Sequence, residues 1–148
     1  MDEDGVEDST KAMVGECIAV RLRTLNRAIT ALYDDALRPH GLRIGQLNLM
    51  VAIAKLGTAR PGDLCRVLRM DKSTLSRDVE VIRRNGWLEV DDSGGGRSRP
   101  LRLTPKGRGL LRAVTPAWQS AQAKAKSVLG EDGSNTLARV VDRLWSGE

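Results

Sequence analysis

The chain has 148 residues, 41% of them hydrophobic and 29% charged, which is enough for one compact domain with a sizeable core. Its two cysteines and single histidine are too few for a disulfide framework or a zinc finger, so we expect no cofactor and no metal. No P-loop, GxGxxG, Ser-His-Asp or Cys-His motif is present, and we expect a protein that is not an enzyme.

The distribution of charge favours an anionic partner. The net charge is +5, and five of the 19 acidic residues lie in the first eight positions, which have no apolar signal segment. We expect residues 1–10 to be a disordered acidic tail. Without that tail the chain has an excess of ten basic residues, a balance typical of nucleic-acid binding. No apolar run is long enough to cross a membrane, so we expect a cytoplasmic protein.

Two helices are predicted in the first half of the chain. Apolar residues at spacings of three and four predict one long helix over Lys11–Arg38, ended by Pro39 and Gly41. Its apolar stripe consists of Ile18, Leu22, Leu25, Ile29, Leu32 and Ala36. The next helix, Ile44–Leu56, is apolar on most sides and is typical of a buried central helix.

A helix-turn-helix follows. Pro61 begins a short third helix over Pro61–Leu68, and Asp71 is a good N-cap for a fourth helix that continues to about Asn85. The connection Arg69–Asp71 has the length expected of a helix-turn-helix corner.

The apolar period then changes from helix to strand. Leu88 and Val90, and later Leu101 and Leu103, alternate with polar residues and predict a two-stranded hairpin. The polar segment between the strands, residues 92–100, contains three glycines and forms a flexible basic tip.

Two more helices complete the chain. Thr104 and Pro105 begin a fifth helix that runs to about Leu129, with a kink expected at Pro116. After a turn over 130–133, a final helix carries Leu137, Val140, Val141 and Leu144. The fold class is therefore mostly α with a small two-stranded β wing.

The fourth helix and the hairpin tip carry the candidate DNA contacts. Opposite its apolar stripe, the fourth helix presents hydroxyl and guanidinium groups, which suit phosphates and base edges in a major groove. The solvated face of an ordinary amphipathic helix explains the same pattern, but the basic hairpin tip beside it favours DNA. The candidate DNA-binding residues are Lys72, Ser73, Thr74, Ser76, Arg77, Arg84, Arg97 and Arg99. Glu80 can orient Arg77 or Arg84, or accept a bond from a cytosine amino group.

The stretch DLCRVLRMDKSTLSRDVEVIRRNGWLEV, followed by GGRSRPLRLTPKGRGLL, resembles the winged-helix core of MarR-type (multiple antibiotic resistance) regulators. The resemblance covers roughly Val14 to Trp145 and implies a winged helix-turn-helix over about 43–104 with dimerisation helices over about 11–38 and 105–146. It matches Ser73, Thr74, Ser76 and Arg77 to recognition-helix positions and Arg97 to the wing arginine. Gly95 stands where the family usually has an aspartate that holds this arginine.

A homodimer is expected, because the terminal helices carry more apolar surface than a winged-helix core covers. Leu110, Val114, Ala117 and Ala121 form such a seam, and Trp118 and Trp145 add large side chains; packing within one chain is the alternative. A two-fold dimer places two recognition helices on a pseudo-palindromic operator in double-stranded DNA.

The resemblance also implies release from DNA by a small aromatic or phenolic ligand. Tyr33, His40, Arg43, Gln46 and Trp118 are the candidate pocket residues, although core packing, an exposed turn or a solvated charge explains each of them as well. We therefore expect a sequence-specific regulator, a repressor that an effector releases. The alternatives are a redox sensor using Cys17, a winged helix that binds protein instead of DNA, and a nonspecific architectural binder.

Overall fold

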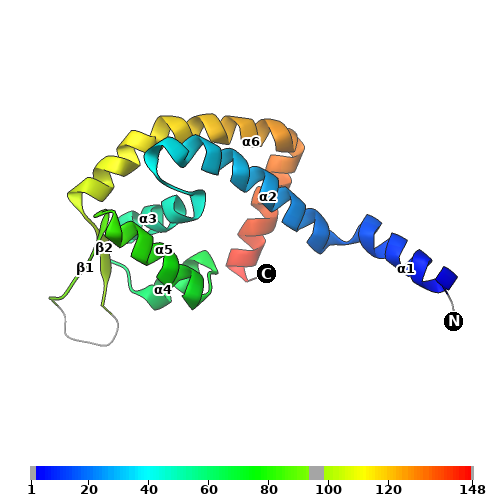
Figure 1. Ribbon diagram of the computed structural model, residues 1–148, viewed down its shortest axis with the longest axis horizontal. Coiled ribbons are helices and arrows are strands. Elements are labelled where there is room, and N and C mark those ends of the chain that lie inside the picture. The colour runs from blue at the N-terminus through cyan, green and yellow to red at the C-terminus, as the bar shows by residue number, and fades with distance from the viewer. Residues whose placement is uncertain (1–2, 94–98, 148) are drawn as a thin grey trace.

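The computed structural model of the chain describes residues 3–93 and 99–147 (Figure 1). Its elements are α1 (Glu3–Glu16), α2 (Ile18–Leu37), the short 3-10 helix η1 (Arg38–His40), α3 (Ile44–Leu56), α4 (Pro61–Leu68), α5 (Lys72–Arg84), β1 (Leu88–Val90), β2 (Leu101–Leu103) and α6 (Pro105–Ser146). The expected fold class, helices with a two-stranded wing, is confirmed. Within the described ranges no helix is long and apolar enough to span a membrane.

The N-terminal region differs from the sequence-based expectation in two respects. Residues 3–10, expected to be disordered, are the first part of α1, and the single helix expected over Lys11–Arg38 is broken at Cys17, whose backbone is extended (φ −63°, ψ 110°). Helix α1 projects away from the rest of the chain (Figure 1), and its side chains from residue 5 onward are exposed. Local interactions therefore favour this helix: an i,i+4 pair of 3.0 Å joins Lys11 to Glu7, and acidic residues lie near its N-terminus.

Helix α3 is the centre of the core, as predicted. It contacts α2, α4, α5, α6 and β2, and its side chains Leu49, Met50 and Ile53 are fully buried. Its N-terminus is held by two side chains: the Ile44 N–H donates to Asp34 Oδ1 (2.7 Å), and the Arg43 N–H donates to Gln46 Oε1 (3.1 Å). These bonds satisfy amide groups that a helix leaves unpaired at its start and fix α3 against the end of α2.

Helices α4 and α5 have the predicted bounds, and the corner between them is tight. Arg69 ends α4 in the left-handed conformation (φ 49°), and the Met70 N–H returns to the Cys65 carbonyl (3.0 Å). The two half-buried residues Cys65 and Met70 pack against the core, so the corner is anchored from inside.

The wing is tied to the helix-turn-helix at its base. Strands β1 and β2 are antiparallel, with Leu88 opposite Leu103. Ala59, in the loop before α4, exchanges two backbone hydrogen bonds with Leu101 (2.9 and 2.7 Å). The wing and the helix-turn-helix therefore form one unit.

Helix α6 begins as predicted, because the Thr104 hydroxyl accepts from the Gly107 N–H (3.0 Å) and Pro105 occupies the first turn. The backbone remains helical at Pro116, where we expected a kink, and the only non-helical residue inside α6 is Gly130 (φ 70°, ψ 170°). The expected turn over 130–133 is thus a one-residue break, since glycine alone adopts such angles without strain. After this break the last part of α6 turns sharply away from the long first part (Figure 1).

Candidate nucleic-acid interface

Helix α5 separates an apolar face from a basic one. Leu75 and Ile82 are buried in the core, whereas Lys72, Ser73 and Ser76 are exposed in the first turns. The exposed guanidinium groups of α5 belong to Arg77, Arg83 and Arg84. The helical period thus brings the hydroxyl and cationic candidates to one solvent-facing surface.

The start of α5 is held by two hydrogen bonds to its N-cap residue, Asp71. The Thr74 N–H and hydroxyl donate to the two carboxylate oxygens of Asp71, at 2.8 and 2.7 Å. The Thr74 hydroxyl bond, and then the backbone bond, hold the pKa of Asp71 below its usual value. Thr74 is therefore half-buried in the cap, which leaves Ser73 and Ser76 as the free hydroxyls of this turn.

Arg77 has no carboxylate partner among the residues that the structure describes. Within the described ranges its side chain forms one hydrogen bond, a long one of 3.4 Å from Nη2 to Thr74 Oγ1. The charge of Arg77 is the smallest of the effects that lower the pKa of Asp71, and it opposes the rise that burial gives the pKa of Asp78. The guanidinium group is exposed and retains the donors needed for a bidentate contact with a base or a phosphate.

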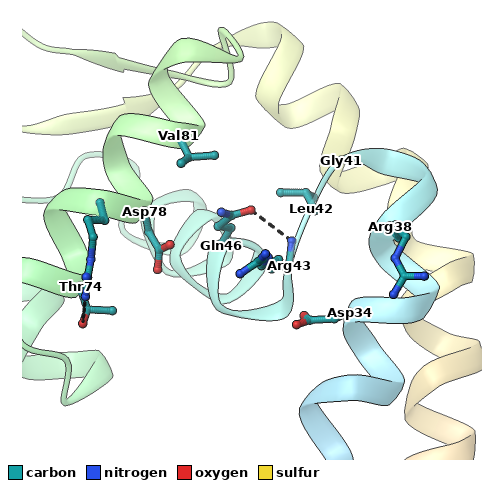
Figure 2. A pocket seen from close by; sticks show the side chains of 10 residues that line it. Asp34, Arg38, Gly41, Leu42, Arg43, Gln46, Thr74, Asp78 and Val81 are labelled. Carbon is teal, nitrogen blue, oxygen red and sulfur yellow. Dashed lines mark hydrogen bonds between the residues drawn. The ribbon is translucent and has the colours of Figure 1, made fainter. Parts of the chain in front are cut away.

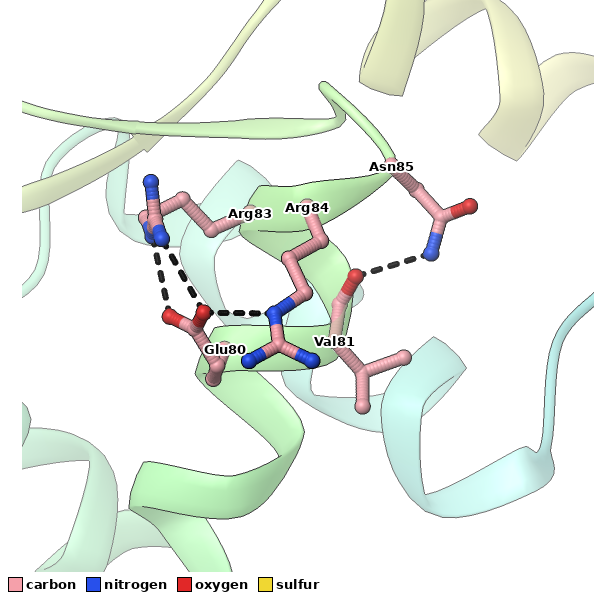
Figure 3. A network of polar contacts seen from close by, with 5 residues as sticks. All are labelled: Glu80, Val81, Arg83, Arg84 and Asn85. Carbon is pink, nitrogen blue, oxygen red and sulfur yellow. Dashed lines mark hydrogen bonds and ion pairs between the residues drawn. The ribbon is translucent and has the colours of Figure 1, made fainter.

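Glu80 organises the last turn of α5 (Figure 3). Its carboxylate accepts from Nε and Nη2 of Arg83, both at 3.0 Å, and from Nε of Arg84 at 2.7 Å. Of the two arginine partners predicted for Glu80, Arg84 is found and Arg77 is not, while the predicted contact with a cytosine amino group stays a prediction. The contact with Arg83 was missed, although its i+3 spacing from Glu80 is visible in the sequence.

The wing places Arg99 beside an acid. Arg99 Nη1 lies 2.8 Å from Asp92 Oδ1, and across the strands Arg102 Nε lies 2.7 Å from Glu89 Oε1. Asp91 instead accepts from the Ser93 hydroxyl and N–H, which lowers the pKa of its carboxyl group. Arg97 and Gly95 lie outside the described residues.

A cleft of about 810 Å³ lies under the N-terminal half of α5 (Figure 2). Its lining residues come from α2, from η1 and the loop that follows it, from α3 and from α5: Asp34, Arg38, Gly41, Leu42, Arg43, Gln46, Thr74, Arg77, Asp78 and Val81. Two candidate DNA contacts, Thr74 and Arg77, therefore also line the cleft.

The five residues predicted to form an effector pocket do not share one cavity. Arg43 and Gln46 line the cleft under α5, whereas Tyr33 and Trp118 line a second pocket of about 390 Å³ between α2, α3 and α6. There the Tyr33 hydroxyl donates to Gln122 Oε1, and burial raises the pKa of the phenol. His40 lies in η1, half-buried and in the lining of neither pocket. Four of the five predicted residues are thus divided between two separate cavities.

Asp78 is a half-buried carboxyl group of α5 that lines the cleft, and it was not among the residues predicted from the sequence. Burial raises the pKa of its side chain, against the opposing effects of a hydrogen bond with Gln46 and the charge of Arg77. The group faces the cleft beside Gln46, which is itself buried (Figure 2). Ionised Asp78 is therefore less stable in the folded chain than in the unfolded chain.

We expect Asp78→Asn to raise the melting temperature at pH 7. The folded pKa of Asp78 lies above its unfolded value of about 3.9, so the ionised form opposes folding above the folded pKa. As the pH falls from above the folded pKa of Asp78 to its unfolded pKa, the wild-type side chain takes up a proton, and the difference in melting temperature between the two proteins disappears. Thermal unfolding at pH 7 and pH 4 measures this change.

Asp35→Asn is the matched control, because Asp35 lies on the surface in an exposed pair with Arg38 and its loss changes stability little. A lower melting temperature for Asp78→Asn than for the wild type at pH 7 contradicts the prediction.

The architecture and sequence match one family. Residues 40–98, from η1 into the wing, match the sequence profile of the MarR family. A probable transcriptional regulator from Pseudomonas aeruginosa has the same fold, with a TM-score of 0.78 and 26% identity over 88% of this chain and 98% of that chain. Residues 40–98 therefore resemble the MarR family in sequence, and the chain has the fold of solved transcriptional regulators.

Two further solved structures, each with DNA, share this fold. The M. tuberculosis transcriptional regulator MosR is 27% identical in a structure in complex with DNA, with a TM-score of 0.75 over 90% of this chain and 99% of that chain. E. coli MarR, bound to operator DNA, has a TM-score of 0.78 over 90% of this chain and 96% of that chain, and at 18% identity it shows the shared fold alone. No curated protein matches the sequence.

Proposed function

We propose that this protein is a MarR-type, sequence-specific regulator of transcription that binds double-stranded DNA in the cytoplasm. The observation that carries the proposal is the exposed face of α5, where Ser73, Ser76 and Arg77, which has no carboxylate partner in the described part of the chain, follow a firmly capped helix start. Helix N-terminal residues of this kind contact base edges when a recognition helix enters the major groove. Two similar structures, MosR and E. coli MarR, were solved with DNA.

The proposed contacts divide by chemistry. The guanidinium group of Arg77 contacts a base edge, and the hydroxyl groups of Ser73 and Ser76 contact the DNA beside it. Thr74 instead fixes the start of the helix through its bonds to Asp71. Lys72 and Arg84, at the two ends of α5, contact phosphates, and Arg97 and Arg99 extend the interface into the flanking minor groove. On this reading residues 43–104 form the DNA-reading unit.

We further propose that the active form is a homodimer held by residues 11–38 and 105–146. Apolar side chains on the outer parts of these helices are exposed in the single chain: Ile18 (72%), Leu22 (56%), Leu137 (42%), Val140 (38%), Leu144 (55%) and Trp145 (66%). An exposed seam of this extent calls for a partner surface, and a second copy supplies the same seam by symmetry.

Leu144→Glu is expected to convert the dimer to a monomer at low micromolar concentration, because a charge in the apolar seam loses its hydration when the copies associate. Sedimentation equilibrium measures the dissociation constant. Val67→Glu is the control, since Val67 is comparably exposed (50%) on α4, outside the seam, and should leave the dimer intact. Equal dissociation constants for wild type and Leu144→Glu contradict the dimer proposal.

We also propose that the protein represses and that a small aromatic or phenolic ligand releases it. The cleft under α5 supports this regulation, because Thr74, Arg77 and Asp78 belong to both the cleft and the recognition helix. A ligand that moves these side chains alters the DNA-facing surface of the same helix. Titrating small phenolic acids into the protein–DNA complex tests the release step.

Competition binding tests the function itself. The protein is titrated into a labelled duplex from directly upstream of its own gene, at two salt concentrations, with scrambled DNA as competitor. Binding that survives the competitor is expected for a sequence-specific regulator. Weak, salt-sensitive binding equal on both duplexes supports a nonspecific architectural role, and no binding to either supports a winged helix that contacts protein.

A further inference from the structure

Helix α5 carries two acids, and they have different environments. Asp78 faces the cleft, whereas Glu80, whose side chain is 39% exposed, belongs to the ridge that the helical period forms with Ser73, Arg77 and Arg84. An acid on a surface meant for phosphates costs binding energy by repulsion. Glu80 therefore needs a reason other than contact with the DNA backbone.

The hydrogen bonds of Glu80 treat its two arginine partners differently. Arg83 donates through both Nε and Nη2, so the edge that would grip a phosphate in a bidentate manner is occupied by the carboxylate. Arg84 donates only through Nε (2.7 Å), and neither of its terminal nitrogens bonds to a described residue (Figure 3). Arg83 is thus withheld, while Arg84 is oriented with its outer nitrogens available.

The network makes the two ends of α5 electrostatically unlike. The bonds from Arg83 and then Arg84 lower the pKa of Glu80, and the contact with Glu80 raises the pKa of Arg83, so the ionised forms of Glu80 and Arg83 are favoured. The last turn then carries one net positive charge from two arginines. Arg77, one turn earlier, has no carboxylate partner in the described chain. Arg77 lies nearer than Arg83 and Arg84 to the N-terminal, base-reading end of the helix.

We propose that Glu80 is a positioning residue for DNA recognition: it withholds Arg83 from the DNA backbone and orients Arg84, so that binding depends on the contacts of Arg77. The inference rests on the proposed function. Ion pairs at i,i+3 and i,i+4, such as those of Glu80 with Arg83 and Arg84, also stabilise a helix by themselves. If that were their only role, replacing Glu80 would change the stability of the protein and leave its discrimination between DNA sequences unchanged.

Glu80→Gln tests the proposal, because glutamine keeps the size of the side chain and removes its charge. Freed arginines reach phosphates, so affinity for scrambled DNA is expected to rise roughly three- to tenfold, and the plot of log affinity against log salt to steepen by about 1 to 2. The preference for the upstream duplex over scrambled DNA falls accordingly. Glu131→Gln, which removes one exposed acid from α6, is the control for net charge.

A double-mutant cycle separates positioning from simple repulsion. In an Arg83→Gln, Arg84→Gln background, Glu80→Gln should no longer change the salt dependence, because the groups through which Glu80 acts are gone. An effect of the same size in both backgrounds, or an unchanged salt slope and preference in the single variant, overturns the proposal while the proposed function stands. A wild type without preference between the duplexes overturns both.

Discussion

Replacing Gly107 with alanine is expected to destabilise the protein by about 3 kcal/mol, the upper part of the usual range for overpacking. A Cβ atom at Gly107 would lie 2.1 Å from the carbonyl oxygen of Trp87 and 2.9 Å from its carbonyl carbon. Trp87 cannot withdraw, since its carbonyl accepts from the Thr104 N–H (3.1 Å) and its side chain is buried. The substitution therefore disturbs the packing of α6 against the segment that connects α5 to the wing.

Gly109→Ala is the matched control for helix propensity. Gly109 is also in the first turns of α6, but an added Cβ atom would meet only the flexible end of Arg112, at 4.0 Å. Alanine there should leave stability unchanged or raise it by up to about 1 kcal/mol. Chemical denaturation of both variants measures the difference. If Gly107→Ala is as stable as Gly109→Ala, the close packing of α6 on Trp87 is wrong.

Arg77→Ala is expected to have the largest effect on DNA recognition. Loss of a bidentate base contact costs about 1–3 kcal/mol on the cognate site and relaxes the preference at one position in each half-site. Arg77 is exposed and unpaired among described carboxylates, so its removal leaves the folded chain otherwise intact. Binding to a panel of single-base variants of the upstream duplex measures both effects.

Arg99→Ala gives the contrasting result. Arg99 lies at the wing, 2.8 Å from Asp92, where a contact with phosphates or the minor groove is expected. Its loss should weaken binding to all duplexes by a similar factor and reduce the salt slope by about 1. If the two variants behave alike on specific and scrambled DNA, the assignment of Arg77 to base reading is contradicted.

The predictions from sequence succeeded where a local signal marks each end of an element. Asp71 caps α5 and Pro61 begins α4, and both are in the structure as their residue types require. The central position of α3 follows from its apolar residues on nearly every side, since only a helix surrounded by others can bury them. Leu88 and Leu103 pair in the wing because period-2 patterns meet across one hairpin.

Features that depend on contacts between distant segments were not predicted. Gln46 caps α3 and contacts Asp78, while Tyr33 bonds to Gln122, 89 positions away, and nothing in the local pattern links these residues. The helix at residues 3–10 was missed for the opposite reason: composition suggested disorder, whereas local charge pairing supports a helix without a core.

Footprinting of the upstream duplex tests the central claim most directly. A dimer that inserts two α5 helices into successive major grooves should protect two half-sites related by two-fold symmetry, with centres about 10 base pairs apart or a multiple of that spacing. Arg77→Ala should weaken both protected regions together. Uniform protection along the duplex, or protection that scrambled DNA removes as readily as unlabelled upstream DNA, would contradict sequence-specific recognition by α5.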